Sequence, residues 1–252
     1  MRLFLVAACA AFGAWLGTLA PWLVYRLAVP AGTTPRDTCP QCCSVLPAGW
    51  RGWVRPSGRC PACHTPPTAH RWAYAAVLAG VFAALASRLP TGRPADVVLA
   101  SAWLSMAATG IVLAGIDLRV NRLPRPIVAA AACVIAPLVV ATAIYDHDAN
   151  LLGRAAGAAA AFGVAYLALA LTGPGLVGLG DVYLATLIGL LLGTGTLAAI
   201  LAGALMPYLL AAPITLIRLM RRRLSRANHI AFGPYLILGA ITAKVLVPAA
   251  VG

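Results

Sequence analysis

The sequence predicts an all-α polytopic membrane protein with about eight transmembrane helices and one sizeable cytoplasmic loop. The chain of 252 residues is 62% hydrophobic and only 10% charged, a composition typical of multi-span membrane proteins. Long stretches without any charged residue alternate with short segments that contain arginine. The net charge is +13, and all six acidic residues are Asp, because the chain contains no Glu.

The predicted helices follow from the stretches that carry no charge. These are Leu3–Tyr25, Trp72–Ser87, Val97–Ile116, Pro126–Tyr145, Ala155–Gly180, Val182–Ile217 and Ile230–Ala243. A spanning helix needs about 20 apolar residues, but Val182–Ile217 would extend roughly 54 Å as one helix at about 1.5 Å per residue. Because Gly193-Thr194-Gly195-Thr196 supplies a turn inside that run, it is divided in two, which gives eight helices.

The arginines predict the orientation of these helices. Placing both chain ends outside puts fourteen of the eighteen arginines on inside segments: Arg26, Arg36, Arg51, Arg55, Arg59, Arg71, Arg119, Arg122, Arg125, Arg218, Arg221, Arg222, Arg223 and Arg226. This distribution satisfies the positive-inside rule. The basic balance is therefore explained by topology, with the lipid bilayer rather than a nucleic acid as partner.

The chain divides into three predicted regions: a first transmembrane span over residues 1–28, a cytoplasmic loop over 29–70 and a seven-span membrane core over 71–252. The first span ends in Tyr25-Arg26 without a small-residue cleavage site, so it is expected to stay uncleaved. Within the core, Gly157, Gly163, Gly189 and Gly203 either permit close helix packing or are background glycines of an Ala-rich and Gly-rich sequence.

Two C-x-x-C pairs in the loop predict a structural zinc site. Cys39 and Cys42 are separated from Cys60 and Cys63 by 17 residues, and four thiolates around a tetrahedral cation are typical of structural zinc. The alternative is a pair of disulfides. Because the predicted topology places the loop on the reducing cytoplasmic side, a zinc ion that folds a loop with little core of its own is favoured.

Two aspartates next to apolar runs are the candidate catalytic residues. Asp117 closes the run Val97–Ile116, and Asp181 interrupts another in Gly178-Leu179-Gly180-Asp181. An acid at membrane depth is costly unless it is paired, hydrated or used. Two neighbouring carboxylates share a proton, so one can activate water while the other polarises a carbonyl group. Gly178 and Gly180 would let a substrate strand approach beside Asp181.

Six motifs in order resemble the type IV prepilin peptidases, relatives of the GxGD-type membrane aspartic proteases. They are Gly17-Thr18-Leu19 with Tyr25-Arg26-Leu27, the two C-x-x-C pairs, Arg71-Trp72-Ala73-Tyr74, Ile116-Asp117-Leu118 with Leu123-Pro124, Gly178-Leu179-Gly180-Asp181-Val182, and Ala231-Phe232-Gly233-Pro234-Tyr235-Leu236. The resemblance covers nearly the whole chain. It implies an aspartic endopeptidase of the bacterial cytoplasmic membrane that removes the basic leader from prepilins or pseudopilins, with Asp117 and Asp181 as the catalytic pair.

The resemblance also implies N-methylation of the new N-terminus from S-adenosylmethionine in many members. This chain departs from the family pattern at three positions: Ala76 stands for a usual Glu, Arg125 for a usual Asp, and Tyr183 for a usual Lys. None of these is a proteolytic aspartate, so cleavage is expected. Because the methyl transfer lacks the usual Glu, S-adenosylmethionine is a cofactor only if that second activity is present.

Two other functions fit parts of the same sequence. A proton-coupled transporter would also carry an intramembrane Asp pair, although no inverted repeat supports it. A non-catalytic assembly factor would use the zinc loop for docking and would tolerate Asn at both Asp positions. The sequence leaves open the oligomeric state, the pilin-like substrate, and a role in pili, secretion or DNA uptake.

Overall fold

The protein is an α-helical bundle in the computed structural model, which describes residues 2–30, 32–47, 49–53, 59–66, 70–88, 90, 92–172, 178–220 and 231–247. Its helices are α1 (Arg2–Leu27), α2 (Trp50–Trp53), α3 (Arg71–Arg88), α4 (Pro94–Val120), α5 (Arg125–Asp146), α6 (Ala149–Thr172), α7 (Leu179–Leu192), α8 (Leu197–Met220) and α9 (Gly233–Leu246). Several residues of the sequence analysis lie outside the described part, among them Arg55, Arg221, Arg222, Arg223 and Arg226.

The predicted all-helical fold is confirmed, with eight helices longer than the single turn of α2 among the described residues. Five of them, α1, α4, α5, α6 and α8, are long and apolar enough to cross a membrane. The helices α7 and α9 are apolar but only 14 residues long. The predicted break inside the longest apolar run is also found, because α7 ends at Leu192 and α8 begins at Leu197.

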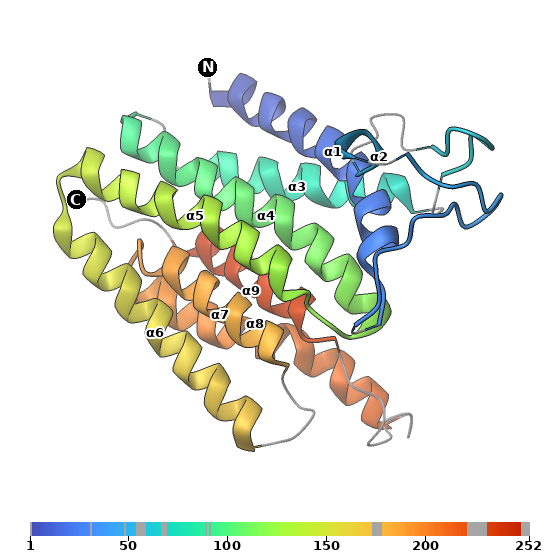
Figure 1. Ribbon diagram of the computed structural model, residues 1–252. Helices are drawn as coiled ribbons and strands as arrows, with labels where there is room; N and C mark the ends of the chain where they lie inside the picture. Colours follow the sequence, from blue (N-terminus) through green and yellow to red (C-terminus); the bar gives the residue numbers. More distant parts are fainter. Residues whose placement is uncertain are drawn as a thin grey trace.

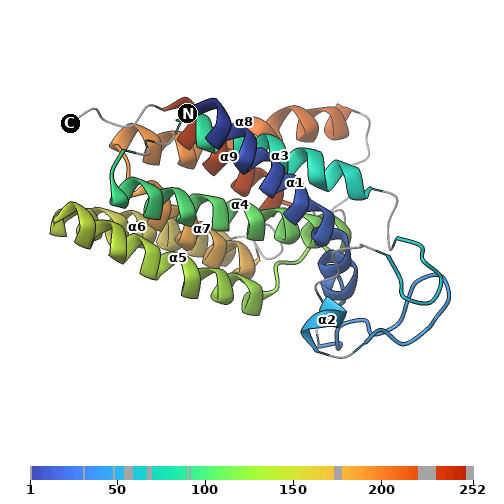
Figure 2. The same cartoon turned by 90° about the horizontal axis from the view of Figure 1, so that it is seen from above.

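The long axes of the helices run roughly along one direction, with the cysteine-containing loop projecting from one end of the bundle (Figure 1). We call this end the loop end. The start of α1 and the finish of α9 both lie toward the opposite end of the bundle (Figures 1 and 2). Helices adjacent in sequence pack against one another as the pairs α1–α3, α4–α5, α6–α7 and α8–α9. The helix α4 also contacts α1, α3 and α9 and is the central element.

The helices α4 and α7 contribute much of the buried core. Trp103, Met106 and Leu113 of α4 pack in the same cluster as Leu184 and Ile188 of α7, and each is at most 1% exposed. A helix that is apolar on all sides is expected where other helices surround it. The buried position of α7 explains how a helix too short to span a bilayer alone is accommodated, since longer helices enclose it.

Glycines set the spacing between α6 and α7. A Cβ atom on Gly189 would lie 2.6 Å from the carbonyl oxygen of Ala158, and one on Gly193 would lie 2.6 Å from Cα of Ala155. A Cβ on Gly163 would lie 2.7 Å from Oγ1 of Thr186. Of the four glycines considered for close packing, Gly157 alone has nothing within 4 Å of its added Cβ. The prediction of close packing is therefore wrong for Gly157, which is one of the background glycines of this Ala-rich and Gly-rich sequence.

The loop is attached to α1 through buried polar and aromatic contacts. The Arg26 side chain donates from Nε to the Arg36 carbonyl and from NH1 to the Gly52 carbonyl, both at 2.9 Å. Its guanidinium lies 4.0 Å from the centre of the Trp53 ring. The fully buried Trp22 packs against Cys39 and Cys60. Arg26, which the positive-inside rule predicts to lie on the inside, therefore also holds the loop against the bundle.

The spacing of α6 and α7 is tested by a matched pair of glycine substitutions. Gly189→Ala forces a methyl group against the α6 backbone and is expected to destabilise the fold by about 1–3 kcal/mol. Gly157→Ala has open space and is expected to be neutral or stabilising by up to about 1 kcal/mol. Denaturant unfolding of the purified protein in one detergent measures both. Equal effects of the two variants would contradict the packing described here.

Candidate functional site

The two cysteine pairs form equivalent knuckles. The Cys43 amide donates to the Cys39 carbonyl and the His64 amide donates to the Cys60 carbonyl, both at 3.1 Å. The Cys39 amide donates to Ser44 and the Cys60 amide to Thr65, both at 2.9 Å. Cys43 and His64, which follow the second cysteine of each pair, have φ of 56°. Each pair is therefore turned tightly enough to point two sulfurs the same way.

The four sulfurs are positioned for a tetrahedral metal ion. All four Sγ atoms lie within 4.8 Å of one another, and the Cys39–Cys63 and Cys42–Cys60 distances are both 3.7 Å. A regular tetrahedron with metal–sulfur bonds of about 2.3 Å has sulfur–sulfur edges of about 3.8 Å. The same distances are far longer than the disulfide bond of about 2.05 Å. These cysteines could hold a metal ion, and the geometry is consistent with zinc.

The knuckle backbone favours a thiolate at this cluster. Burial of Cys60 works against ionisation, but hydrogen bonds from the backbone of Cys63 and Ala62 outweigh it and lower the pKa of the Cys60 thiol to about 6. Thiolates, not thiols, are the metal ligands. Burial raises the pKa of the Cys39 thiol to about 11. A bound cation stabilises the thiolate form of its ligands, so a metal ion is the partner that suits all four sulfurs.

Asp117 lies near the loop end of α4 and caps another helix. Its side chain is buried, and its Oδ2 accepts a hydrogen bond of 2.9 Å from the amide of Gly233, the first residue of α9. The first amides of a helix have no partner within the helix and carry partial positive charge. The carboxylate of Asp117 therefore meets the positive end of α9.

Asp181 occupies the first turn of α7 and caps its own helix. Its Oδ2 accepts a hydrogen bond of 2.9 Å from the amide of Gly178. Its Oδ1 is buried and has no hydrogen-bond partner among the described residues. One oxygen thus fixes the side chain at the helix N-terminus, while the other remains available to a bound group.

The structure brings the surroundings of the two carboxylates together. Leu123, in the turn after α4, packs against both glycines beside them: an added Cβ on Gly180 would lie 2.7 Å from Cβ of Leu123, and one on Gly233 would lie 3.3 Å from both Leu123 methyl carbons. The Cβ on Gly233 would also lie 2.9 Å from Oδ2 of Asp117. Both predicted acids therefore belong to one site.

Both carboxylates lie below the ends of neighbouring helices. The α6–α7 contacts place Asp181 level with about residue 167, so α6 continues beyond it by about 7 Å. Gly239 packs against Pro207, which places Gly233 level with Pro213, so α8 continues beyond it by about 10 Å. The site is set back from the loop end between these helices.

The two predicted substrate-binding glycines differ in their surroundings. An added Cβ on Gly178 would meet only the Asp181 side chain, at 3.4 Å, and the Gly180 amide nitrogen, at 3.9 Å, and Gly178 is exposed. Gly180 has no such space, because an added Cβ would lie 2.6 Å from the Leu123 carbonyl oxygen. A chain approaching Asp181 therefore has access at Gly178, whereas Gly180 allows α7 to pack on Leu123.

Sequence reasoning missed an aromatic group at this site. Tyr166 of α6 is 4% exposed and its hydroxyl has no hydrogen-bond partner among the described residues. Phe232, the residue before Gly233, contacts three tyrosine rings: those of Tyr166, Tyr208 and Tyr235. The one feature of the sequence that could have pointed to Tyr166 is its hydroxyl group inside the charge-free stretch Ala155–Gly180.

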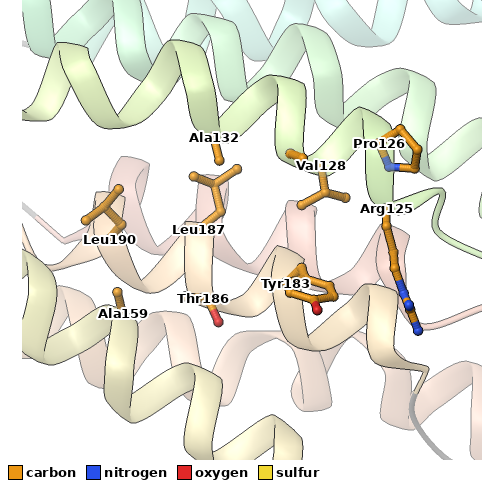
Figure 3. A pocket seen from close by; sticks show the side chains of 10 residues that line it. Arg125, Pro126, Val128, Ala132, Ala159, Tyr183, Thr186, Leu187 and Leu190 are labelled. Carbon is orange, nitrogen blue, oxygen red and sulfur yellow. The ribbon is translucent and has the colours of Figure 1, made fainter.

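A cavity of about 560 Å³ lies between α5, α6 and α7 but does not contain the carboxylates (Figure 3). It is lined on α7 by Tyr183, Thr186, Leu187 and Leu190. Positions two, five, six and nine residues after Asp181 lie on the opposite face of a helix with 3.6 residues per turn. The remaining lining is mostly apolar, with Arg125 beside Tyr183 at one end (Figure 3).

Comparison with protein-family models gives a match over the part of the chain that carries both acids. Residues 104–219 match the model of the type IV leader peptidase family. The predicted family is thereby confirmed. The matched segment contains both Asp117 and Asp181, and it extends from α4 to the last turn of α8. The comparisons with curated proteins and with solved structures gave no match.

The match supports a leader peptidase activity, and the helices support a multi-pass membrane protein. The cysteine loop lies outside the matched segment. The role of the loop is therefore inferred from its own geometry, in which four cysteine sulfurs are grouped next to the end of α1.

The metal content of the purified protein tests the cysteine cluster. Purified protein is expected to contain about one zinc ion per chain, because four thiolates complete a tetrahedral shell. Elemental analysis should show the zinc lost in the double variant Cys39→Ser, Cys42→Ser. The matched control is Cys9→Ser with Cys133→Ser, two cysteines outside the cluster, which should leave the zinc in place. Four oxidised cysteines in native membranes would contradict both the zinc site and a cytoplasmic loop.

Proposed function

We propose that this protein is an aspartic endopeptidase of the bacterial cytoplasmic membrane that removes the basic leader peptide from type IV prepilins or pseudopilins. The observation that carries the proposal is that Asp117 and Asp181 lie beside two glycines that share Leu123 as a neighbour, inside the segment that matches the leader peptidase family. Both carboxylates are held at helix N-termini by backbone amides. The substrate is expected to reach them from the cytoplasmic side.

The proposed reaction uses the pair as one acid–base unit. The ionised carboxylate takes a proton from a water molecule, whose oxygen attacks the carbonyl carbon of the scissile peptide bond. The protonated carboxyl donates its proton to the carbonyl oxygen. Collapse of the tetrahedral intermediate then breaks the carbon–nitrogen bond, and the leaving amine takes up a proton. The shared proton belongs to the pair, so neither role is assigned to one residue.

The three predicted regions fit this proposal. Residues 71–252 supply the peptidase core, residues 1–28 the first span, and residues 29–70 a loop that zinc stabilises next to the inside end of that span. The loop offers no open coordination position when four thiolates bind one zinc ion, so its proposed role is structural rather than catalytic. Gly178 is proposed to lie beside the substrate backbone, since it is exposed next to Asp181.

Replacement of either aspartate tests the proposed function. Asp117→Asn and Asp181→Asn are each expected to reduce leader removal by at least about 10³-fold, because Asn cannot exchange a proton across the pair. Processing of a co-expressed prepilin on a gel measures the effect. Asp148→Asn is the matched control, since Asp148 pairs with Arg154 at the opposite end of the bundle. Near wild-type processing by either single site variant would sink the dyad assignment.

Methylation is the second proposed test of function. We propose normal cleavage with weak or absent methylation, because Ala76 replaces the usual acid and is exposed on α3. Transfer of a methyl group to an amine usually needs a base that takes the amine proton. Mass spectrometry of the processed pilin decides the matter. A mature N-terminus fully shifted by one methyl group, dependent on this protein and S-adenosylmethionine, would show that the activity is present.

A further inference from the structure

Two buried polar atoms at the site lack hydrogen-bond partners among the described residues. They are Oδ1 of Asp181 and the hydroxyl oxygen of Tyr166. An unsatisfied buried polar group costs about 1–3 kcal/mol, so two of them at one site indicate a group that binds there. The phenol of Tyr208 lies next to that of Tyr166.

The packing of α6 on α7 places these two atoms at the same level. Moving toward the loop end, Gly193 lies opposite Ala155, Gly189 opposite Ala158, and Thr186 opposite Gly163. The seven residues from Gly193 to Thr186 on α7 are matched by the eight residues from Ala155 to Gly163 on α6. The next step brings Tyr166 level with Val182 and Asp181.

The aromatic contacts fix the ring of Tyr166 on the same side as Asp117. The centre of its ring lies 6.3 Å from that of Phe232, and the next residue, Gly233, donates to Asp117. The phenol ring therefore packs against the residue that precedes the capping amide of Asp117, although it comes from a helix that supplies no residue to the sequence motifs. Its 4% exposure leaves little freedom for the ring to turn away.

We propose that Tyr166 is a third catalytic residue, whose hydroxyl oxygen and Asp181 Oδ1 together hold the attacking water. The water donates one hydrogen to the carboxylate that removes it and the other to the phenol oxygen. This arrangement leaves a lone pair of the water oxygen directed at the substrate carbonyl carbon. Positioning of a nucleophile in this way acts on the chemical step rather than on substrate binding. The inference deepens the proposed peptidase function and rests on it.

The substitution Tyr166→Phe removes the hydroxyl and keeps the ring. Cleavage of a prepilin is expected to show kcat lowered by about 100-fold with KM changed less than about twofold. Tyr145→Phe is the matched control, because Tyr145 is exposed near the opposite end of α5. Wild-type kcat in Tyr166→Phe, or a change confined to KM, would overturn the inference. If Asp117→Asn were inactive in that same assay, the proposed peptidase function would stand and only the inference about Tyr166 would fall.

A spectroscopic measurement tests the same contact without catalysis. The infrared carboxyl bands of Asp181, obtained by subtracting the Asp181→Asn spectrum, are expected to shift in Tyr166→Phe and to stay unchanged in Tyr145→Phe. Unchanged bands in Tyr166→Phe would overturn the inference whether or not a prepilin is cleaved. Should Tyr166→Phe fail to fold, 3-fluorotyrosine at position 166 keeps both ring and hydroxyl, and an unaltered pH dependence of kcat would count against the proposal.

Discussion

The amide of Gly233 donating to the buried carboxylate of Asp117 is the contact on which the arrangement of the site depends. A carboxylate among apolar helices is unfavourable unless donors or charges meet it. Here the donor is the positive end of a helix, and the same solution is used by Asp181 in the first turn of α7. Two helices must therefore begin at the depth of the acids rather than at the end of the bundle.

This requirement accounts for the unequal lengths of the helices. The two 14-residue helices, α7 and α9, carry the capping amides, while α4, α5, α6 and α8 have 22 to 27 residues and surround them. Both short helices follow a glycine or begin with one, and each glycine lies beside an acid. Leu123 fills the space between Gly180 and Gly233. Packing, capping and helix length at the site thus have one cause.

The sequence predicted the helix count, the break after Leu192 and the cysteine cluster, because each has a local signal. Charge-free length marks a helix, paired Gly and Thr mark a turn, and C-x-x-C spacing marks a knuckle. The cap of Asp117 by Gly233 could not be found in this way, because 116 residues separate the two. Tyr166 was missed for the same reason, since its relation to Asp181 exists only through the register of α6 on α7. The packing role of Gly180 likewise required knowing where Leu123 lies.

The set-back position of the acids has a consequence for the shape of any chain that reaches them. The helices α6 and α8 rise about 7 Å and about 10 Å past the carboxylates. An extended chain covers that depth in about three residues, at about 3.3 Å each, whereas a helix has a diameter of about 10 Å and needs about seven residues. A peptide bond that reaches both acids in an extended chain is therefore preceded by about three residues that lie between α6 and α8.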